Sequence, residues 1–138
     1  MTWTHEESIE AAAAPERIWR LFSDVAGWKS WNRGIEHIEI HGPFEVGTRF
    51  TMQPPGSDAF VSTLTAVQEN EAFTDETVID DTRVEVHHRI QPLADGRCRI
   101  IYSTTITGPA AAEIGPFVTE DFGSVLLSLK RLSESPMQ

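Results

Sequence analysis

The sequence has a single cysteine, few basic residues and no long hydrophobic run. Cys98 is the only cysteine among 138 residues, which excludes an internal disulfide and agrees with a reducing compartment. Eleven Lys and Arg residues against 21 Asp and Glu residues give a net charge of −10, and the basic residues are scattered along the chain. This charge makes nucleic acids and anionic membranes poor partners.

We also expect no segment for membrane insertion or export. The longest apolar runs, such as Ala11–Ala14, are far shorter than the roughly 20 residues needed to span a bilayer. Met1–Glu10 lacks the basic start and the apolar core of a signal peptide. We therefore expect a cytoplasmic protein with no nucleic-acid partner and no membrane partner.

Several catalytic and cofactor motifs are absent as well. The chain has no Gly-x-Ser-x-Gly, no phosphate-binding glycine loop and no His-Glu-x-x-His, so hydrolase, nucleotide-binding and metalloprotease functions lose their usual support. His37, Glu39 and His41 have a spacing that zinc can use. Because Ile38 and Ile40 occupy the other side of that segment, we expect a solvated outer face there. We expect neither an organic cofactor nor a metal.

The composition that is present is that of one globular domain. Apolar residues make up 40% of the chain and charged residues 23%. A chain of this length buries roughly two-thirds of the surface that its unfolded form exposes, which is enough for a sizeable core. No internal repeat or linker divides it. We predict a single domain over 1–138, either a monomer or a homodimer.

Hydrophobic periodicity predicts a strand, two short helices and then a series of strands. Trp3–Glu10 alternates and is typical of a strand. Pro15 suits the first turn of a helix with a regular apolar face, and Asp24 can cap a second short helix that carries Trp28 and Trp31. The connections that follow are short enough for hairpins, so neighbouring strands should pair antiparallel. The six further predicted strands are Ile35–His41, Thr48–Gln53, Phe60–Gln68, Ala72–Asp80, Arg83–Pro92 and Arg97–Thr107.

A long amphipathic helix is predicted at the C-terminal end of the chain. Gly108-Pro109 ends the last strand, and apolar residues then return at intervals of three and four from Ile114 to Leu132. Gly115-Pro116 is the expected position of a kink in this helix.

This order of elements and the start of the chain resemble a known superfamily. The segment Ala14-Pro15-Glu16-Arg17-Ile18-Trp19, followed by Asp24, Gly27-Trp28 and Trp31-Asn32, is similar to the START/Bet v 1-like (SRPBCC) superfamily, in its polyketide cyclase/dehydrase and lipid-transport branch. The resemblance covers nearly the whole chain. It implies an α+β helix-grip fold, in which a curved seven-stranded antiparallel sheet wraps around a long C-terminal helix and encloses a cavity for an apolar or aromatic molecule.

Strand alternation predicts which polar side chains point into such a cavity. Side chains two residues apart share a face of a sheet, so His88 should point inward and His87 outward. The same argument places Asp75 and Tyr102 on the inner face.

Hairpin length predicts how these three groups pair. A two-residue turn at Asp81-Thr82 would set Asp75 opposite His88, and a three-residue turn at Ala94–Gly96 would set His88 opposite Tyr102. A glycine bulge in the second turn would shift the second pairing, so the first pairing is the firmer prediction. Opposed residues have Cβ atoms roughly 5 Å apart, so the three groups should form one row within hydrogen-bonding reach.

The predicted row of Asp75, His88 and Tyr102 has two interpretations. In a catalytic site, the carboxylate would hold the imidazole tautomer and raise its basicity, while the phenol donates a proton to a carbonyl oxygen. Such a set suits enolisation and aldol-type ring closure with loss of water, which is the chemistry implied by the cyclase resemblance. Alternatively, the groups satisfy one another or bind a ligand's oxygen atoms without turnover. We favour the second interpretation because it needs the same geometry and no catalysis.

Large apolar side chains on the same faces are expected to line the cavity and bind a small hydrophobic or aromatic molecule. Non-catalytic carriers or sensors, and Hsp90 co-chaperone-like interaction domains, remain alternatives within the same superfamily. The co-chaperone alternative predicts a filled interior and a large exposed apolar patch, so a cavity would distinguish it. The predicted lining residues, beside Tyr102, are Phe50, Met52, Phe60, Leu64, Phe73, Val86, Phe117, Phe122 and Leu126.

Other reactive or aromatic side chains are assigned to structure. The four tryptophans could stack an aromatic ligand, but their positions favour packing of the helices onto the sheet. Cys98 is expected to be an inert core thiol. Glu113, Glu120 and Asp121 flank the last helix, where we expect solvated charges near the mouth of the cavity.

Overall fold

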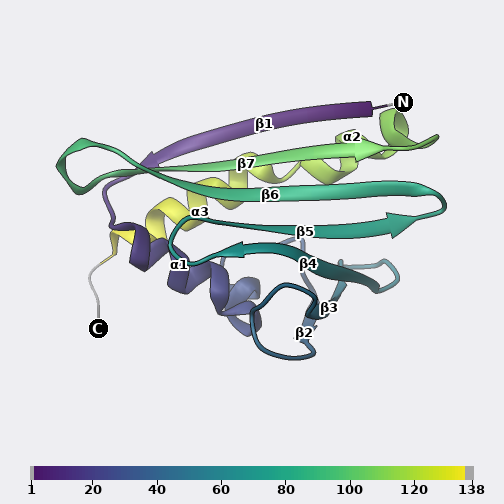
Figure 1. Ribbon diagram of the computed structural model, residues 1–138, viewed down its shortest axis with the longest axis horizontal. Helices are drawn as coiled ribbons and strands as arrows, with labels where there is room; N and C mark the ends of the chain where they lie inside the picture. Colours follow the sequence, from purple (N-terminus) through teal and green to yellow (C-terminus); the bar gives the residue numbers. More distant parts are fainter. Residues whose placement is uncertain (1, 136–138) are drawn as a thin grey trace.

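A computed structural model describes residues 2–135 and shows a curved antiparallel sheet folded over a bent C-terminal helix (Figure 1). The sheet has seven strands in the order β1-β7-β6-β5-β4-β3-β2. The predicted α+β helix-grip architecture is therefore confirmed. The strands are Thr2–Ala11 (β1), His37–Ile40 (β2), Arg49–Gln53 (β3), Phe60–Gln68 (β4), Ala72–Ile79 (β5), Thr82–Pro92 (β6) and Cys98–Thr107 (β7).

The helices lie where the periodicity placed them, apart from the break in the last one. Two short helices follow β1, and the C-terminal helical region crosses the inner side of the sheet (Figure 1). Among the described residues, no helix is both long enough and apolar enough to span a membrane. The helices are Pro15–Ser23 (α1), Val25–Ser30 (the 3₁₀ helix η1), Ala94–Gly96 (the 3₁₀ turn η2), Ala111–Thr119 (α2) and Phe122–Glu134 (α3).

The predicted kink at Gly115-Pro116 is wrong, because the helix is interrupted at Glu120-Asp121. Pro116 lies inside α2, where its missing N–H leaves the carbonyl of Ala112 without a donor. Ala112 is exposed, so water can satisfy that carbonyl. Asp121 has φ −105° and ψ 3°, outside helical geometry, and α3 restarts with the N–H of Val125 donating to its carbonyl.

The predicted turn between β5 and β6 is also shifted by one residue. The turn residues are Asp80 and Asp81, with φ of 45° and 66°, so Ile79 pairs with Thr82. A two-residue turn of this hand needs positive φ at both positions, which Asp tolerates and β-branched Thr resists. Thr82 is instead fully buried, and its Oγ1 accepts a hydrogen bond from the N–H of Ala110 at 3.1 Å.

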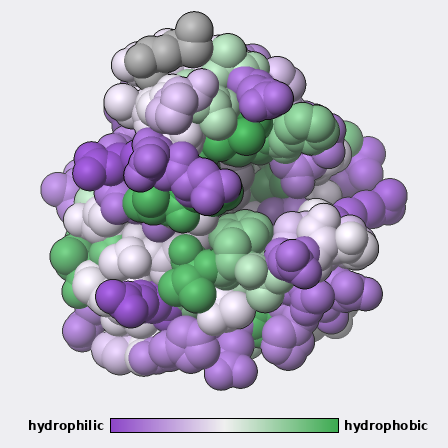
Figure 2. All heavy atoms as spheres, turned by 90° about the vertical axis from the view of Figure 1, so that its right-hand side faces the viewer, coloured by the Kyte–Doolittle hydropathy of each residue, from purple (hydrophilic) through white to green (hydrophobic). Residues whose placement is uncertain are grey.

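One end of the molecule carries a hollow. Figure 2 shows the face that corresponds to the right-hand end of Figure 1, where hydrophobic side chains gather around a central depression. The turn between β5 and β6 and the helix α2 lie at this end (Figure 1).

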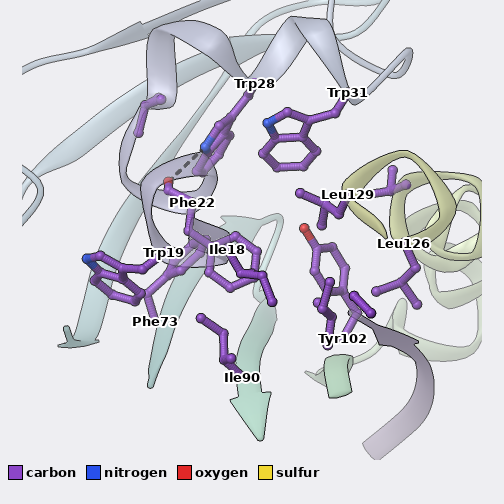
Figure 3. Close-up of a cluster of buried hydrophobic side chains, with 14 of the residues drawn as sticks. Ile18, Trp19, Phe22, Trp28, Trp31, Phe73, Ile90, Tyr102, Leu126 and Leu129 are labelled. Atoms are coloured by element: carbon purple, nitrogen blue, oxygen red, sulfur yellow. Dashed lines mark hydrogen bonds between the residues drawn. The ribbon is translucent and has the colours of Figure 1, made fainter. Parts of the chain in front are cut away.

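The other end is filled by an aromatic core around α1 (Figure 3). Phe22 packs edge-on against Phe73 of β5 at 5.2 Å between ring centroids, and its carbonyl accepts a hydrogen bond of 2.9 Å from the indole N–H of Trp28. Trp19, Trp28 and Trp31 are all buried, in agreement with their predicted packing role. The thiol of Cys98 is fully buried in the same core.

The outer face of the first hairpin is solvated. His37, Glu39 and His41 are all exposed, and no cluster of three potential metal-ligating side chains occurs within residues 2–135.

Candidate functional site

A cavity of about 630 Å³ lies between the inner face of the sheet and α2 and α3. Its volume is in the range of small-molecule sites. The interior is therefore not filled, unlike that expected for a co-chaperone-like domain. Of the predicted lining residues, seven form part of its wall: Phe50, Met52, Phe60, Val86, Tyr102, Phe117 and Phe122.

Three predicted lining residues, Leu64, Phe73 and Leu126, are absent from the wall. All three are almost completely buried in the core around α1. Phe73 is covered on one side by the ring of His88, which stacks on it with 3.9 Å between ring centroids, and on another side by Phe22. Strand and helix periodicity show which side chains point toward the inner face of the sheet. They do not show whether a side chain lies at the end filled by the core or at the end that holds the cavity, so these three residues could not be distinguished from the residues of the wall.

The wall also contains residues outside the predicted lining. Trp28 and Trp31 line the cavity in addition to packing on the core. Pro54 and Pro55 come from the loop between β3 and β4, and Ile114 comes from α2. The aromatic character of the two tryptophans and the helical spacing of Ile114 offered a signal. Pro54 and Pro55 offered none, because strand alternation does not extend into a loop.

The three polar side chains of the predicted row all face this cavity, although one pairing differs from the prediction. His88 lies opposite Tyr102, as the second hairpin predicts, and their rings meet edge-on at 4.6 Å. Asp75 lies opposite Val86 and not opposite His88, because of the shifted turn. The firmer of the two predicted pairings is thus the wrong one. Asp75 is still a diagonal neighbour of His88, with Oδ2 3.9 Å from Nε2.

The tautomer of His88 follows from its contact with the backbone. Its Nδ1 lies 3.3 Å from the carbonyl oxygen of Phe73, and a carbonyl can only accept, so Nδ1 carries the proton. Nε2 is then a bare acceptor on the side of Asp75. The distance of 3.9 Å to Oδ2 is too long for a direct hydrogen bond.

Burial moves the pKa values of His88 and Asp75 in opposite directions. It lowers the pKa of His88 from 6.5 to about 3 and raises the pKa of Asp75 from 3.8 to about 7. The imidazole is therefore uncharged at neutral pH, and its 3.9 Å contact with Asp75 is not an ion pair. The expectation that the carboxylate makes His88 more basic is wrong. Asp75 is the member of the row that changes charge near neutral pH.

Tyr102 remains a protonated phenol at neutral pH. Burial, followed by the nearby carboxyls of Asp75 and Asp121, raises its pKa well above the ordinary value of 10. In Figure 3 its ring rises from the sheet and its oxygen points toward Trp31. The phenol can therefore donate a hydrogen bond to a group in the cavity.

Asp75 and Tyr102 have polar atoms available to a ligand. Neither side chain forms a hydrogen bond with another of the described residues, although both residues are less than one-tenth exposed. Within residues 2–135, every completely shielded side-chain N or O atom has a hydrogen-bond partner. The oxygens of these two side chains are consequently open to the cavity that they line. Ser62 and Thr77, also in the wall, satisfy each other with a 2.6 Å hydrogen bond.

Sequence comparison assigns the chain to a family. Residues 2–134 match the model of a family described as polyketide cyclase / dehydrase and lipid transport. The chain belongs to this family. Among curated proteins, no sequence matches it.

Several solved structures share the fold of this polyketide cyclase/dehydrase family member. The chain is similar to Zhui aromatase/cyclase from Streptomyces sp. R1128, with a TM-score of 0.82 and 13% identity over 97% of this chain and 94% of that one. It is also similar to norcoclaurine synthase from Thalictrum flavum (TM-score 0.79, 19% identity, 100% and 90% coverage). A START superfamily protein from Mycobacterium smegmatis gives a TM-score of 0.76 with 17% identity and coverages of 95% and 97%.

The cavity of this family member is acidic as well as aromatic. Its wall includes Asp75, Glu120 and Asp121 but no Lys or Arg. We expected solvated charges on the last helix. Glu120 and Glu113 are exposed, but Asp121 is partly buried, and burial raises its pKa. Asp121 reaches across to Gly34, where an added Cβ would lie 2.8 Å from its Oδ2.

Proposed function

We propose that this protein binds a small, largely aromatic or apolar molecule in the cavity, with the polar group of that molecule at Asp75 and Tyr102. The observation that carries the proposal is the pair of buried side chains that have no hydrogen-bond partner among residues 2–135, at the wall of a cavity of about 630 Å³. An unsatisfied buried polar group is costly, so a ligand that hydrogen-bonds both groups gains more than its apolar contacts alone provide.

The similar structures support a small-molecule partner. The norcoclaurine synthase structure holds dopamine and hydroxybenzaldehyde, which are both small aromatic molecules. The exposed large apolar residues give little support to a co-chaperone-like docking surface. Two of them, Ile79 and Phe117, belong to the cavity wall, and others, such as Val46, Val61 and Leu127, come from separate elements.

We further propose acid–base catalysis of the cyclase or dehydrase type at the same groups. Ionised Asp75 would remove a proton from a carbon next to a carbonyl, while Tyr102 donates a hydrogen bond to that carbonyl oxygen. The resulting enolate would attack a second carbonyl of the same molecule, and protonated Asp75 would give its proton to the alkoxide that forms. Asp75 would then take the second proton of the attacking carbon and pass it to the new hydroxyl, which leaves as water. The bare Nε2 of His88 would accept a hydrogen bond from protonated Asp75 once the two side chains move closer than their present separation of 3.9 Å. A pKa near 7 suits Asp75 to both directions of this transfer.

Two measurements test the proposed function. Native mass spectrometry of the purified protein should show a co-purifying small molecule, and titration with poly-β-ketone mimics should quench the fluorescence of Trp28 and Trp31 in the wall. Product analysis by liquid chromatography then separates binding from conversion.

Variants assign the roles. Tyr102→Phe should weaken binding about threefold to tenfold, the value of one hydrogen bond. Asp75→Asn should abolish conversion. His87→Gln is the control for both variants, because His87 lies on the outer face of the sheet, away from the cavity. Binding without conversion by the unmodified protein would refute the catalytic proposal and leave a carrier or sensor. Absence of binding in every assay would refute the proposed function itself.

A further inference from the structure

The charges of the cavity wall all have one sign. Asp75, Glu120 and Asp121 supply carboxyl groups, and the lining includes no Lys or Arg. The ion pairs of Arg83, Arg97, Arg99 and Lys130 all use other carboxylates, namely Glu76, Glu85, Glu10 and Glu134. The acidic groups of the cavity are thus left without a cation from the described part of the chain.

Two of these carboxyls lie where an unpaired charge is expensive. Asp75 is 8% exposed and accepts no hydrogen bond among residues 2–135, and Asp121 is partly buried. Burial raises the pKa of both groups, and both contribute to the raised pKa of Tyr102, so they act on the same part of the cavity. General acidity of the chain does not account for them, because a solvated surface carboxylate carries no such penalty. A cation held in the cavity would supply the missing countercharge.

The rest of the wall suits the body of an aromatic cation. Six aromatic rings contribute to it, from Trp28, Trp31, Phe50, Phe60, Phe117 and Phe122. Aromatic faces attract cations and also pack on flat apolar ligands. The same carboxyls repel a carboxylate, a sulfate or a phosphate on a ligand.

We infer that the cavity selects protonated aromatic amines, with the ammonium group at the end where Asp75 and Asp121 lie near Tyr102, and that it rejects anionic ligands. This inference rests on the proposed function, because it names the ligand class of the same cavity. A neutral ligand with a hydroxyl group would satisfy the hydrogen bonds of Asp75 but not its charge.

Three ligands that differ only in one group test this selectivity. They are 2-(2-naphthyl)ethylamine, 2-(2-naphthyl)ethanol and 3-(2-naphthyl)propanoate, titrated by calorimetry at pH 8. At this pH Asp75 is mostly ionised and the amine is protonated. The amine should bind at least tenfold more tightly than the alcohol, and the propanoate should bind at least tenfold more weakly than the alcohol.

Variants connect the selectivity to the two carboxyls. In Asp75→Asn and in Asp121→Asn, the ratio of amine affinity to alcohol affinity should fall at least fivefold. Glu113→Gln removes an exposed carboxyl of α2 outside the cavity wall, so it should leave that ratio unchanged. Equal binding of alcohol and amine, or an unchanged ratio in both cavity variants, would overturn the inference while the proposed function stands. If none of the three ligands binds, the inference and the proposed aromatic-binding function both fail.

Discussion

Replacing Asp75 with Asn should make the protein more stable at neutral and alkaline pH but not in acid. The carboxyl group of Asp75 is almost fully buried and has no hydrogen bond or cationic partner among the described residues. Its charged form is therefore disfavoured in the folded state, and burial raises its pKa from 3.8 to about 7. An amide in its place carries no charge at any pH.

The sign and size of the effect follow from proton linkage. Between pH 3.8 and about 7 the folded state keeps a proton on Asp75 that the unfolded state has lost, so the stability provided by this group falls as the pH rises. A pKa that moves from 3.8 to about 7, at roughly 1.4 kcal/mol for each pH unit, corresponds to about 4 kcal/mol. Above pH 7 the loss is complete and the difference between the two proteins should level off.

Urea unfolding at pH 4, 6 and 8 measures this difference. The free energy of unfolding of Asp75→Asn, minus that of the unmodified protein, should grow by about 4 kcal/mol from pH 4 to pH 8. A constant offset from the lost carboxyl geometry is irrelevant, because only the change with pH counts. Glu113→Gln provides the control, since it removes an exposed carboxyl. A pH-independent difference for Asp75→Asn would refute the reasoning, because it would mean that cavity water solvates the charge.

Two further predictions concern the packing of α2 and the state of His88. Gly115→Ala should lower the free energy of unfolding by about 1–3 kcal/mol in denaturant titrations, because the new Cβ would lie 2.5 Å from Cδ2 of the Trp3 indole. Gly123→Ala meets only Glu7 Oε1 at 3.5 Å and should cause no loss, so equal effects of the two changes would contradict the proposed contact. In nitrogen NMR, His88 should show a protonated Nδ1 and a bare Nε2 down to about pH 3, and a titration near pH 6.5 would contradict its burial.

The strands and their faces could be predicted because a local pattern decides them. Alternation along β6 places His88 inside and His87 outside without any knowledge of the partner strands. The pairing of His88 with Tyr102 also followed, because Ala94–Gly96 forms the expected three-residue connection between Leu93 and Arg97 and no bulge shifts the register. Whether these inward groups bind or transform a ligand stays a prediction.

The residue that lies opposite Asp75 on the neighbouring strand could not be predicted in the same way. Asp80, Asp81 and Thr82 are consecutive, and either adjacent pair of them can be predicted as a two-residue turn. A shift of the turn by one residue changes the cross-strand partner by two, which replaced His88 with Val86 opposite Asp75. The competition was decided by Thr82, whose burial and hydrogen bond to Ala110 depend on a helix far along the chain.

The protonation states and the extent of the cavity depend on distant contacts. Nothing near His88 in the sequence indicates that Phe73 stacks on its ring or that its proton goes to a backbone carbonyl. In the same way, Leu64 and Phe50 are both inward residues of neighbouring strands, yet Leu64 is sealed in the core and Phe50 reaches the cavity. The separation arises from α1, which fills only one end of the grip.

The complete burial of Cys98 has a practical consequence for spectroscopy. Its thiol is 0% exposed, and burial raises its pKa, so maleimides and other sulfur-directed reagents should leave it untouched in the native protein. A second cysteine at the exposed rim, for example Ser57→Cys, would then be the sole point of attachment for a spin label or a dye. Distances from that label to a bound ligand could then be measured by paramagnetic relaxation or energy transfer without first replacing Cys98.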